Sequence, residues 1–276
     1  MIGWDTRWDP DSRPDHVRVG PIGWVLAAIR AVALLVVLIA GLLILLALRL
    51  PERLWSGTRR PWTSRLTQGV CRLSLRTLGF RLTVRGAPLA GWGAVVANHS
   101  SWLDIFVLNA CQPITFVSKS EVARWPFIGW LARATGTVFI ERDPRKAAAQ
   151  ARLFVERIRQ GDRLLFFPEG TSTDGMRVLP FKSTLFEAFF AEGLADVMAI
   201  QPVAVTYRAP KGTDPRFYGW WGDMSLAPHL LLTLAALRQG GAEVDLLPPI
   251  PVAAAGSRKV LAAAAEAAVR GAHWQP

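Results

Sequence analysis

Two polar side chains five positions apart could act as a base and its orienting partner. His99 and Asp104 belong to residues 98–104 (NHSSWLD), which directly follow the apolar run at residues 93–97. The run is typical of a buried strand, and a helical pattern begins at Trp102. We therefore expect His99 in a strand-to-helix turn, with Asp104 one helical turn in and able to reach the imidazole. Such a carboxylate fixes the tautomer of a histidine base and stabilises the imidazolium that it becomes.

Other roles for these residues stay open from the sequence alone. His99 could belong to a helix cap without chemistry, with Ser100 or Ser101 as the N-cap. Either serine could be a nucleophile, although neither lies in a Gly-x-Ser-x-Gly elbow. A metal site built from His99, Asp104 and Glu169 would hold fewer histidines than open zinc sites normally use. We therefore expect no metal.

A second polar turn follows the apolar run at residues 163–167. Pro168 ends the run, and Glu169, Gly170 and Thr171 follow. Gly170 would let the backbone approach a ligand closely, and Thr171 offers a hydroxyl and an amide. Taken alone, the segment would equally suit a capping loop with a solvated Glu169.

Four blocks, in order and at matching spacing, resemble those of the glycerolipid acyltransferase family, which includes the bacterial 1-acylglycerol-3-phosphate acyltransferases. They are His99 with Asp104, residues 136–142 (GTVFIER), residues 167–171 (FPEGT) and residues 200–205 (IQPVAV). The match spans residues 93–206, and the spacing agrees as well as the letters. A hydrophobic segment near the N-terminus also fits the family.

The resemblance implies direct acyl transfer that needs no cofactor, metal or covalent acyl-enzyme. His99 would deprotonate the acceptor hydroxyl, which then attacks the thioester of an acyl-acyl-carrier protein or acyl-CoA. Arg142 would contact the anionic headgroup of a lyso-lipid acceptor, and Glu169, Gly170 and Thr171 would belong to the same acceptor site.

One departure bears on the acceptor. Family members that form phosphatidate usually continue the third block with arginine, a bidentate phosphate partner, where this chain has Ser172. Residues 179–186 (LPFKSTLF) look more like the branch that acylates lyso-ornithine lipid and related aminolipids, which carry a carboxylate in place of phosphate. Arg142 and Lys182 would bind that carboxylate. We expect an aminolipid acceptor, with 1-acyl-sn-glycerol-3-phosphate as the alternative and hydrolysis of a lipid ester or thioester as a further one.

The elements that must position these blocks alternate between strand and helix. This pattern predicts an α/β domain with a mixed, largely parallel sheet flanked by helices, as in glycerolipid acyltransferases. Strands are expected at 81–85, 93–97, 114–118, 137–140, 163–167 and 198–206, and helices at 102–110, 127–134, 144–160, 185–192, 227–238 and 257–270.

The segment before the sheet suits a membrane. Residues 22–48 are apolar apart from Arg30, and the uncharged part is near the length that crosses a hydrocarbon core. It is too long for a signal peptide and starts too far from the N-terminus. It either spans the bilayer or enters one leaflet as a hairpin bent at Gly41. Seven arginines between positions 49 and 76 place the following side in the cytoplasm by the positive-inside tendency. Residues 63–78 are amphipathic, which suits either the membrane surface or packing on the domain.

The composition agrees with a membrane enzyme. The chain of 276 residues is 51% hydrophobic, carries a net charge of +11 and contains 12 tryptophans. A basic surface attracts anions, and tryptophan favours the headgroup zone, so we expect a bilayer as partner and no nucleic acid. An acidic carrier protein or CoA would be attracted too. We divide the chain into a flexible lead (1–21), membrane-embedded and interfacial helices (22–80) and a catalytic domain (81–276) on the cytoplasmic side of the inner membrane.

Overall fold

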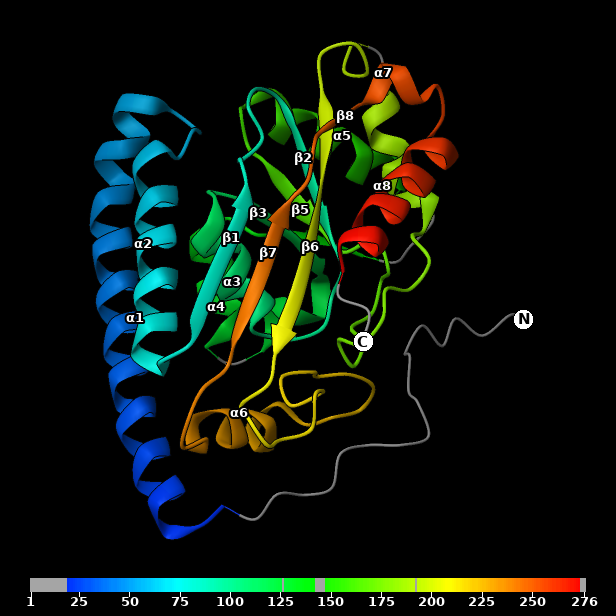
Figure 1. Ribbon diagram of the computed structural model, residues 1–276. Coiled ribbons are helices and arrows are strands. Elements are labelled where there is room, and N and C mark those ends of the chain that lie inside the picture. The colour runs from blue at the N-terminus through cyan, green and yellow to red at the C-terminus, as the bar shows by residue number, and fades with distance from the viewer. Residues whose placement is uncertain (1–18, 126, 142–146, 192, 274–276) are drawn as a thin grey trace.

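A mixed sheet forms the centre of the molecule (Figure 1). The computed structural model describes residues 19–125, 127–141, 147–191 and 193–273. In this part of the chain eight strands follow the order β1-β7-β6-β2-β5-β3-β4, with β8 beside β6. They are β1 (Arg81–Gly86), β2 (Gly93–Ala97), β3 (Thr115–Lys119), β4 (Val138–Ile140), β5 (Leu164–Phe166), β6 (Ala199–Arg208), β7 (Gly241–Leu246) and β8 (Ile250–Pro251).

The sheet is largely parallel, which confirms the expected fold class. β2 lies between β5 and β6 and is parallel to both, while β6 pairs antiparallel with β7 and β8. The sequence reading missed β7 and β8. In β7, Glu243 and Asp245 alternate with buried apolar residues, and their carboxylates bind arginines of the neighbouring strands. The two acidic residues obscured the strand pattern of β7 in the sequence. Pairing with β1 and β6 stabilises this strand.

Helices cover both faces of the sheet. One face packs against α2 (Pro61–Leu78), α3 (Asp104–Cys111) and α6 (Leu226–Ala235), and the other against α5 (Ala147–Arg159), the 3-10 helix η3 (Ser183–Phe190) and α8 (Arg258–Ala272). The short helices η1 (Ser120–Arg124), α4 (Ile128–Thr135) and α7 (Val252–Ala255) complete the set in the described chain. The helix expected at 185–192 is thus a 3-10 helix. α3 begins at Asp104 instead of Trp102, because residues 101–103 form a turn first.

The N-terminal apolar segment forms one continuous helix, α1 (Pro21–Ser56), which runs beside α2 and on towards α6 (Figure 1). The hairpin bent at Gly41 is therefore wrong. Gly41 instead allows close packing, because a Cβ built there would come within 2.6 Å of Val70 on α2. In the described chain, α1 is the one helix that is long and apolar enough to cross a membrane. Most of its large apolar side chains are exposed, which indicates association with a membrane.

Polar contacts hold α1 to α6 near its start and to α2 near its end. Near its start, Arg30 donates hydrogen bonds to the carbonyl oxygens of Leu234 and Ala236 at the end of α6. Near its end, the fully buried Glu52 accepts hydrogen bonds from the Thr63 amide and hydroxyl at the start of α2. A carboxylate at a helix N-terminus satisfies amides that lack partners inside the helix. α1 is therefore held to the domain directly through α6 and indirectly through α2, which packs on α3.

Candidate active site

The predicted site lies at the carboxyl ends of the parallel strands β2 and β5, with β6 on the other side of β2. Ala97, the last residue of β2, pairs with Val203 in β6. The Asn98 side chain then extends this pairing, because its Oδ1 accepts from the Val205 amide at 2.8 Å and its Nδ2 donates to the Val205 carbonyl at 2.9 Å. Asn98 thus holds the chain against β6 at the point where it leaves the sheet. This fixes where the following residue, His99, begins the turn.

His99 and Asp104 meet as the sequence predicts. Their Nδ1 and Oδ2 atoms are 2.7 Å apart. An ionised carboxylate only accepts hydrogen bonds, so this geometry assigns the proton to Nδ1 and leaves Nε2 as an acceptor. The His99 side chain is 23% exposed, whereas that of Asp104 is fully buried. The pair is therefore arranged so that the imidazole reaches solvent or substrate and the carboxylate does not.

The turn before α3 also binds the Asp104 carboxylate. Oδ2 accepts from the amides of Ser100 at 2.9 Å and Ser101 at 3.1 Å. Neither serine is the N-cap of α3, which is Leu103, although the Ser101 hydroxyl accepts from the Leu103 amide at 3.3 Å. The backbone thus fixes the carboxylate in the rotamer that faces His99.

Glu169 lies beneath the histidine. It is 2% exposed, and its two carboxylate oxygens accept from the His99 amide at 2.7 Å and the Leu179 amide at 2.8 Å. Burial raises the pKa of Glu169 to about 8, while the two amides act in the opposite direction. A direct headgroup contact was predicted for Glu169. The observed contacts are better explained if Glu169 positions the main chain of His99.

The His99 ring and carbonyl are held as well. The Phe167 ring, one residue beyond β5, stacks on the imidazole with centroids 4.0 Å apart. The Thr173 amide donates to the His99 carbonyl at 2.9 Å. Side chain, amide and carbonyl of His99 therefore all have fixed partners, which lowers the entropy lost on reaching a reactive geometry.

The other predicted acceptor residues are placed in part. Gly170 has a φ of 73°, and a Cβ built on it would lie 2.8 Å from the Lys182 ammonium, so glycine leaves room for that cation. Thr171 is half-buried beside them. Arg142 lies outside the described residues.

Two further contacts of the site were not predicted. The Tyr207 hydroxyl donates to Asp104 Oδ1 at 2.5 Å. Trp102, in the turn before α3, donates its indole N–H to Nδ1 of His229 on α6 at 2.9 Å. Tyr207 lies two positions after the proline-centred fourth block. Its place near the site could have been predicted only if the strand were known to extend to residue 208.

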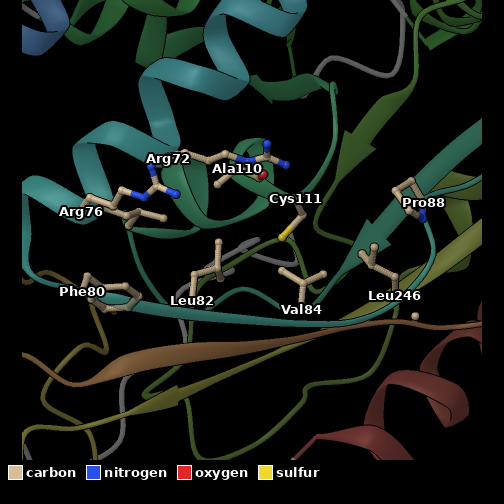
Figure 2. Close-up of a pocket in the computed structure, with 11 residues that line it drawn as sticks. Arg72, Arg76, Phe80, Leu82, Val84, Pro88, Ala110, Cys111 and Leu246 are labelled. Carbon is tan, nitrogen blue, oxygen red and sulfur yellow. Dashed lines mark hydrogen bonds between the residues drawn. The ribbon is translucent and has the colours of Figure 1, made fainter.

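A cavity of about 330 Å³ lies elsewhere, between α2, β1 and the end of α3 (Figure 2). Its wall is mostly apolar, with Phe80, Leu82 and Val84 on one side, and Arg72 and Arg76 contribute guanidinium groups. None of the predicted site residues lines it. Burial raises the pKa of its Cys111 thiol to about 12, so the thiol stays protonated at neutral pH.

The fold and the histidine-carboxylate pair are those of an α/β acyltransferase, and the comparisons agree. The acyltransferase family model matches residues 82–206. The chain belongs to the glycerolipid acyltransferase family. It is 63% identical over 243 residues to the lyso-ornithine lipid O-acyltransferase of Rhodobacter capsulatus, covering 88% of each chain. It is 38% identical over 236 residues to the enzyme of the same name from Brucella abortus, covering 79% of this chain and 85% of that one.

A solved structure shares the fold. The 1-acyl-sn-glycerophosphate acyltransferase PlsC of Thermotoga maritima superposes with a TM-score of 0.57 and 19% sequence identity, covering 90% of this chain and 100% of that one. The family match and the two relatives, taken together with this fold, show that the chain is an acyltransferase enzyme.

Proposed function

We propose that this enzyme transfers a fatty acyl group from a thioester to the hydroxyl of lyso-ornithine lipid. The observation that carries the proposal is the 63% identity, over 88% of both chains, with an enzyme named for that acceptor. Ser172 supports it, because a phosphate acceptor would lose a bidentate arginine at this position.

The geometry of the dyad supports transfer of a proton from the acceptor hydroxyl to the free ring nitrogen of His99. His99 Nε2 takes the proton of the acceptor hydroxyl, and the oxygen attacks the thioester carbonyl carbon. The C–S bond then breaks, the ester forms, and the imidazolium returns the proton to the departing thiolate. Asp104, 2.7 Å from Nδ1, stabilises the imidazolium between these two events. The step needs no metal or cofactor beyond the thioester of an acyl-acyl-carrier protein or acyl-CoA.

The acceptor headgroup would be bound beside the third block. Lys182, over Gly170, offers a cation to the ornithine carboxylate, and Arg142 would supply a second. A carboxylate has one charge fewer than a phosphate monoester, so fewer guanidinium partners suffice.

The lipid acceptor would reach this site from the bilayer. The exposed apolar face of α1 supplies the membrane contact, and the arginines that follow support a cytoplasmic catalytic domain at the inner membrane.

An acyl-transfer assay tests the proposal. The purified protein would receive labelled acyl-acyl-carrier protein together with either lyso-ornithine lipid or lysophosphatidic acid. We expect product with lyso-ornithine lipid, and a loss of at least about a thousandfold in His99→Ala, since the base is removed. His273→Gln, at the end of α8, is the matched histidine control and should retain activity.

The other results have definite meanings. Product from lysophosphatidic acid alone would replace the proposal with phosphatidate synthesis. Release of free fatty acid that depends on His99 and needs no acceptor would make the protein a hydrolase. Wild-type turnover in His99→Ala would end the mechanism for any acceptor.

A further inference from the structure

The Asp104 carboxylate binds a second side chain besides His99, the hydroxyl of Tyr207. One of its oxygens, Oδ2, faces His99 and the two serine amides. The other, Oδ1, accepts a hydrogen bond of 2.5 Å from the Tyr207 hydroxyl. The side chains of Asp104 and Tyr207 are both buried, so water does not compete for this bond.

We propose that Tyr207 is a positioning residue of the acyl-transfer site: its hydroxyl fixes the Asp104 carboxylate and moderates the charge that Asp104 presents to His99. The inference rests on the proposed roles of His99 and Asp104 in the reaction, and it does not depend on which lipid is the acceptor.

β6 delivers the hydroxyl because it is longer than its neighbour. β2 ends at Ala97, opposite Val203, whereas β6 continues to Arg208. Tyr207 therefore lies four residues, or about 13 Å, beyond the last paired position, where its hydroxyl reaches Asp104 at the start of α3. The antiparallel partner β7 supports this extension, because Tyr207 pairs with Ala242.

The phenol ring has little freedom to move. It packs against Phe80, with ring centroids 6.2 Å apart, and against Tyr218 at 5.8 Å. Burial and the nearby Asp104 charge raise the pKa of Tyr207 well above its ordinary value. The hydroxyl thus remains protonated and donates to the carboxylate throughout the working pH range.

Among the described residues, four titratable side chains lie near the dyad and Tyr207. Glu169, with a pKa raised to about 8, lies under His99, and His229, with a pKa lowered to about 4 by burial, holds Trp102. Cys111 and Tyr218 face Tyr207 and have pKa values raised to about 12, and Arg30 of α1 faces Tyr218.

Removing the hydroxyl has two consequences. In Tyr207→Phe, Oδ1 loses its donor, so the carboxylate stays bound through Oδ2 but is held less rigidly opposite His99. We expect kcat to fall about ten- to a hundredfold, with KM changed less than about twofold. The carboxylate also presents more of its negative charge to the imidazolium, so His99 should keep its proton to higher pH. The acid limb of the kcat profile should therefore move upward, by about half a pH unit to one unit.

Tyr218→Phe is the matched control, because Tyr207 and Tyr218 are the two tyrosines of the chain and share one aromatic cluster. The Tyr218 hydroxyl donates to Gln239 Oε1 and accepts from the Gly240 amide, each at 2.8 Å. Its loss should lower the melting temperature and leave kcat and the acid limb unchanged.

The experiment measures kcat, KM and the pH profile of both variants, and follows the His99 ring by NMR titration with labelled histidine, assigned by comparison with His99→Ala. The titration needs no substrate, so it tests Tyr207 even if the proposed acceptor is wrong. The expected result is an upward shift of the His99 titration in Tyr207→Phe alone. An unchanged titration, or the same loss of kcat in both variants, would overturn the proposal and leave Tyr207 as a packing residue.

Discussion

At the residue scale, the site is a histidine whose ring Nδ1, amide and carbonyl are each held by a different residue. Asp104 binds its ring, Glu169 binds its amide and Thr173 binds its carbonyl. The three partners come from α3 and from the loop after β5. A catalytic geometry that depends on several segments should be sensitive to changes that do not touch the substrate.

Glu169 gives a pH-dependent stability that can be measured. Its pKa is about 8 in the folded protein and about 4.3 in an unfolded chain, so the folded state binds more protons between these values. Stability therefore falls as pH rises from about 4.5 to about 8, by an amount on the order of a few kcal/mol. We expect the melting temperature in detergent micelles to be several degrees lower at pH 8.5 than at pH 6.

Glu169→Gln should reduce that difference. The variant loses one amide partner and so starts less stable, but it carries no charge to bury at high pH. Glu121→Gln, which removes an exposed carboxylate, should keep the wild-type pH dependence. An undiminished difference in Glu169→Gln would mean that Glu169 does not titrate in this range.

The sequence predicted the residues of the dyad better than their surroundings. His99 and Asp104 are only five positions apart and directly follow a strand, so local pattern sufficed. The contacts of Tyr207 with Asp104 and of Trp102 with His229 each join residues more than 100 positions apart, and no local pattern encodes them. Glu169 was recognised by its motif, but its burial follows from packing that the motif does not contain.

At the element scale, the same limit applies to the helices and strands. β2 was predicted to the residue because it is a continuous apolar run, while β7 was missed because its outward positions are acidic. For α1, composition predicted an apolar helix, but its placement along the domain depends on Gly41 and on the contacts of Arg30 and Glu52.

The placement of α1 predicts its orientation in the membrane. Gly23, packed near Ala235 on α6, and Glu52, bound to α2, are 29 positions or about 44 Å apart. α2 packs on α3, so both positions of α1 are held to the same folded body. A helix crossing about 30 Å of hydrocarbon would draw the domain into the bilayer with it. We therefore expect α1 to lie along one leaflet, with its N-terminal end on the side of the catalytic domain.

Cysteine labelling tests this expectation, because the native Cys71 and Cys111 are buried. Gly20→Cys, just before α1, should react with a membrane-impermeant maleimide on the same side as Val260→Cys, an exposed position of α8. Both should react only in inverted vesicles if the domain is cytoplasmic. Reaction of the two positions from opposite sides would show that α1 spans the bilayer.

At the scale of the whole molecule, the net charge of +11 suits the proposed donors, acyl-acyl-carrier protein and acyl-CoA, which are both anions. An acidic acyl carrier protein would be attracted over long range by such a surface, and salt would screen the attraction, since the Debye length falls from about 10 Å at 0.1 M to about 3 Å at 1 M. Fields of this kind act on encounter more than on chemistry. The charge should therefore appear in KM for the donor and not in kcat.

Raising NaCl from about 0.05 to 0.5 M, in neutral detergent micelles with saturating acceptor, should raise KM for acyl-acyl-carrier protein about tenfold and leave kcat within about twofold. Acyl-CoA, a small anion without a protein surface, should show a weaker dependence. Acyl-pantetheine, which has the same thioester and no charge, should show almost none and so controls for effects of salt on the fold. Only a charge that meets the donor can change the encounter of the donor with the enzyme. If KM for acyl-acyl-carrier protein is as insensitive to salt as KM for acyl-pantetheine, the basic surface therefore serves the membrane alone.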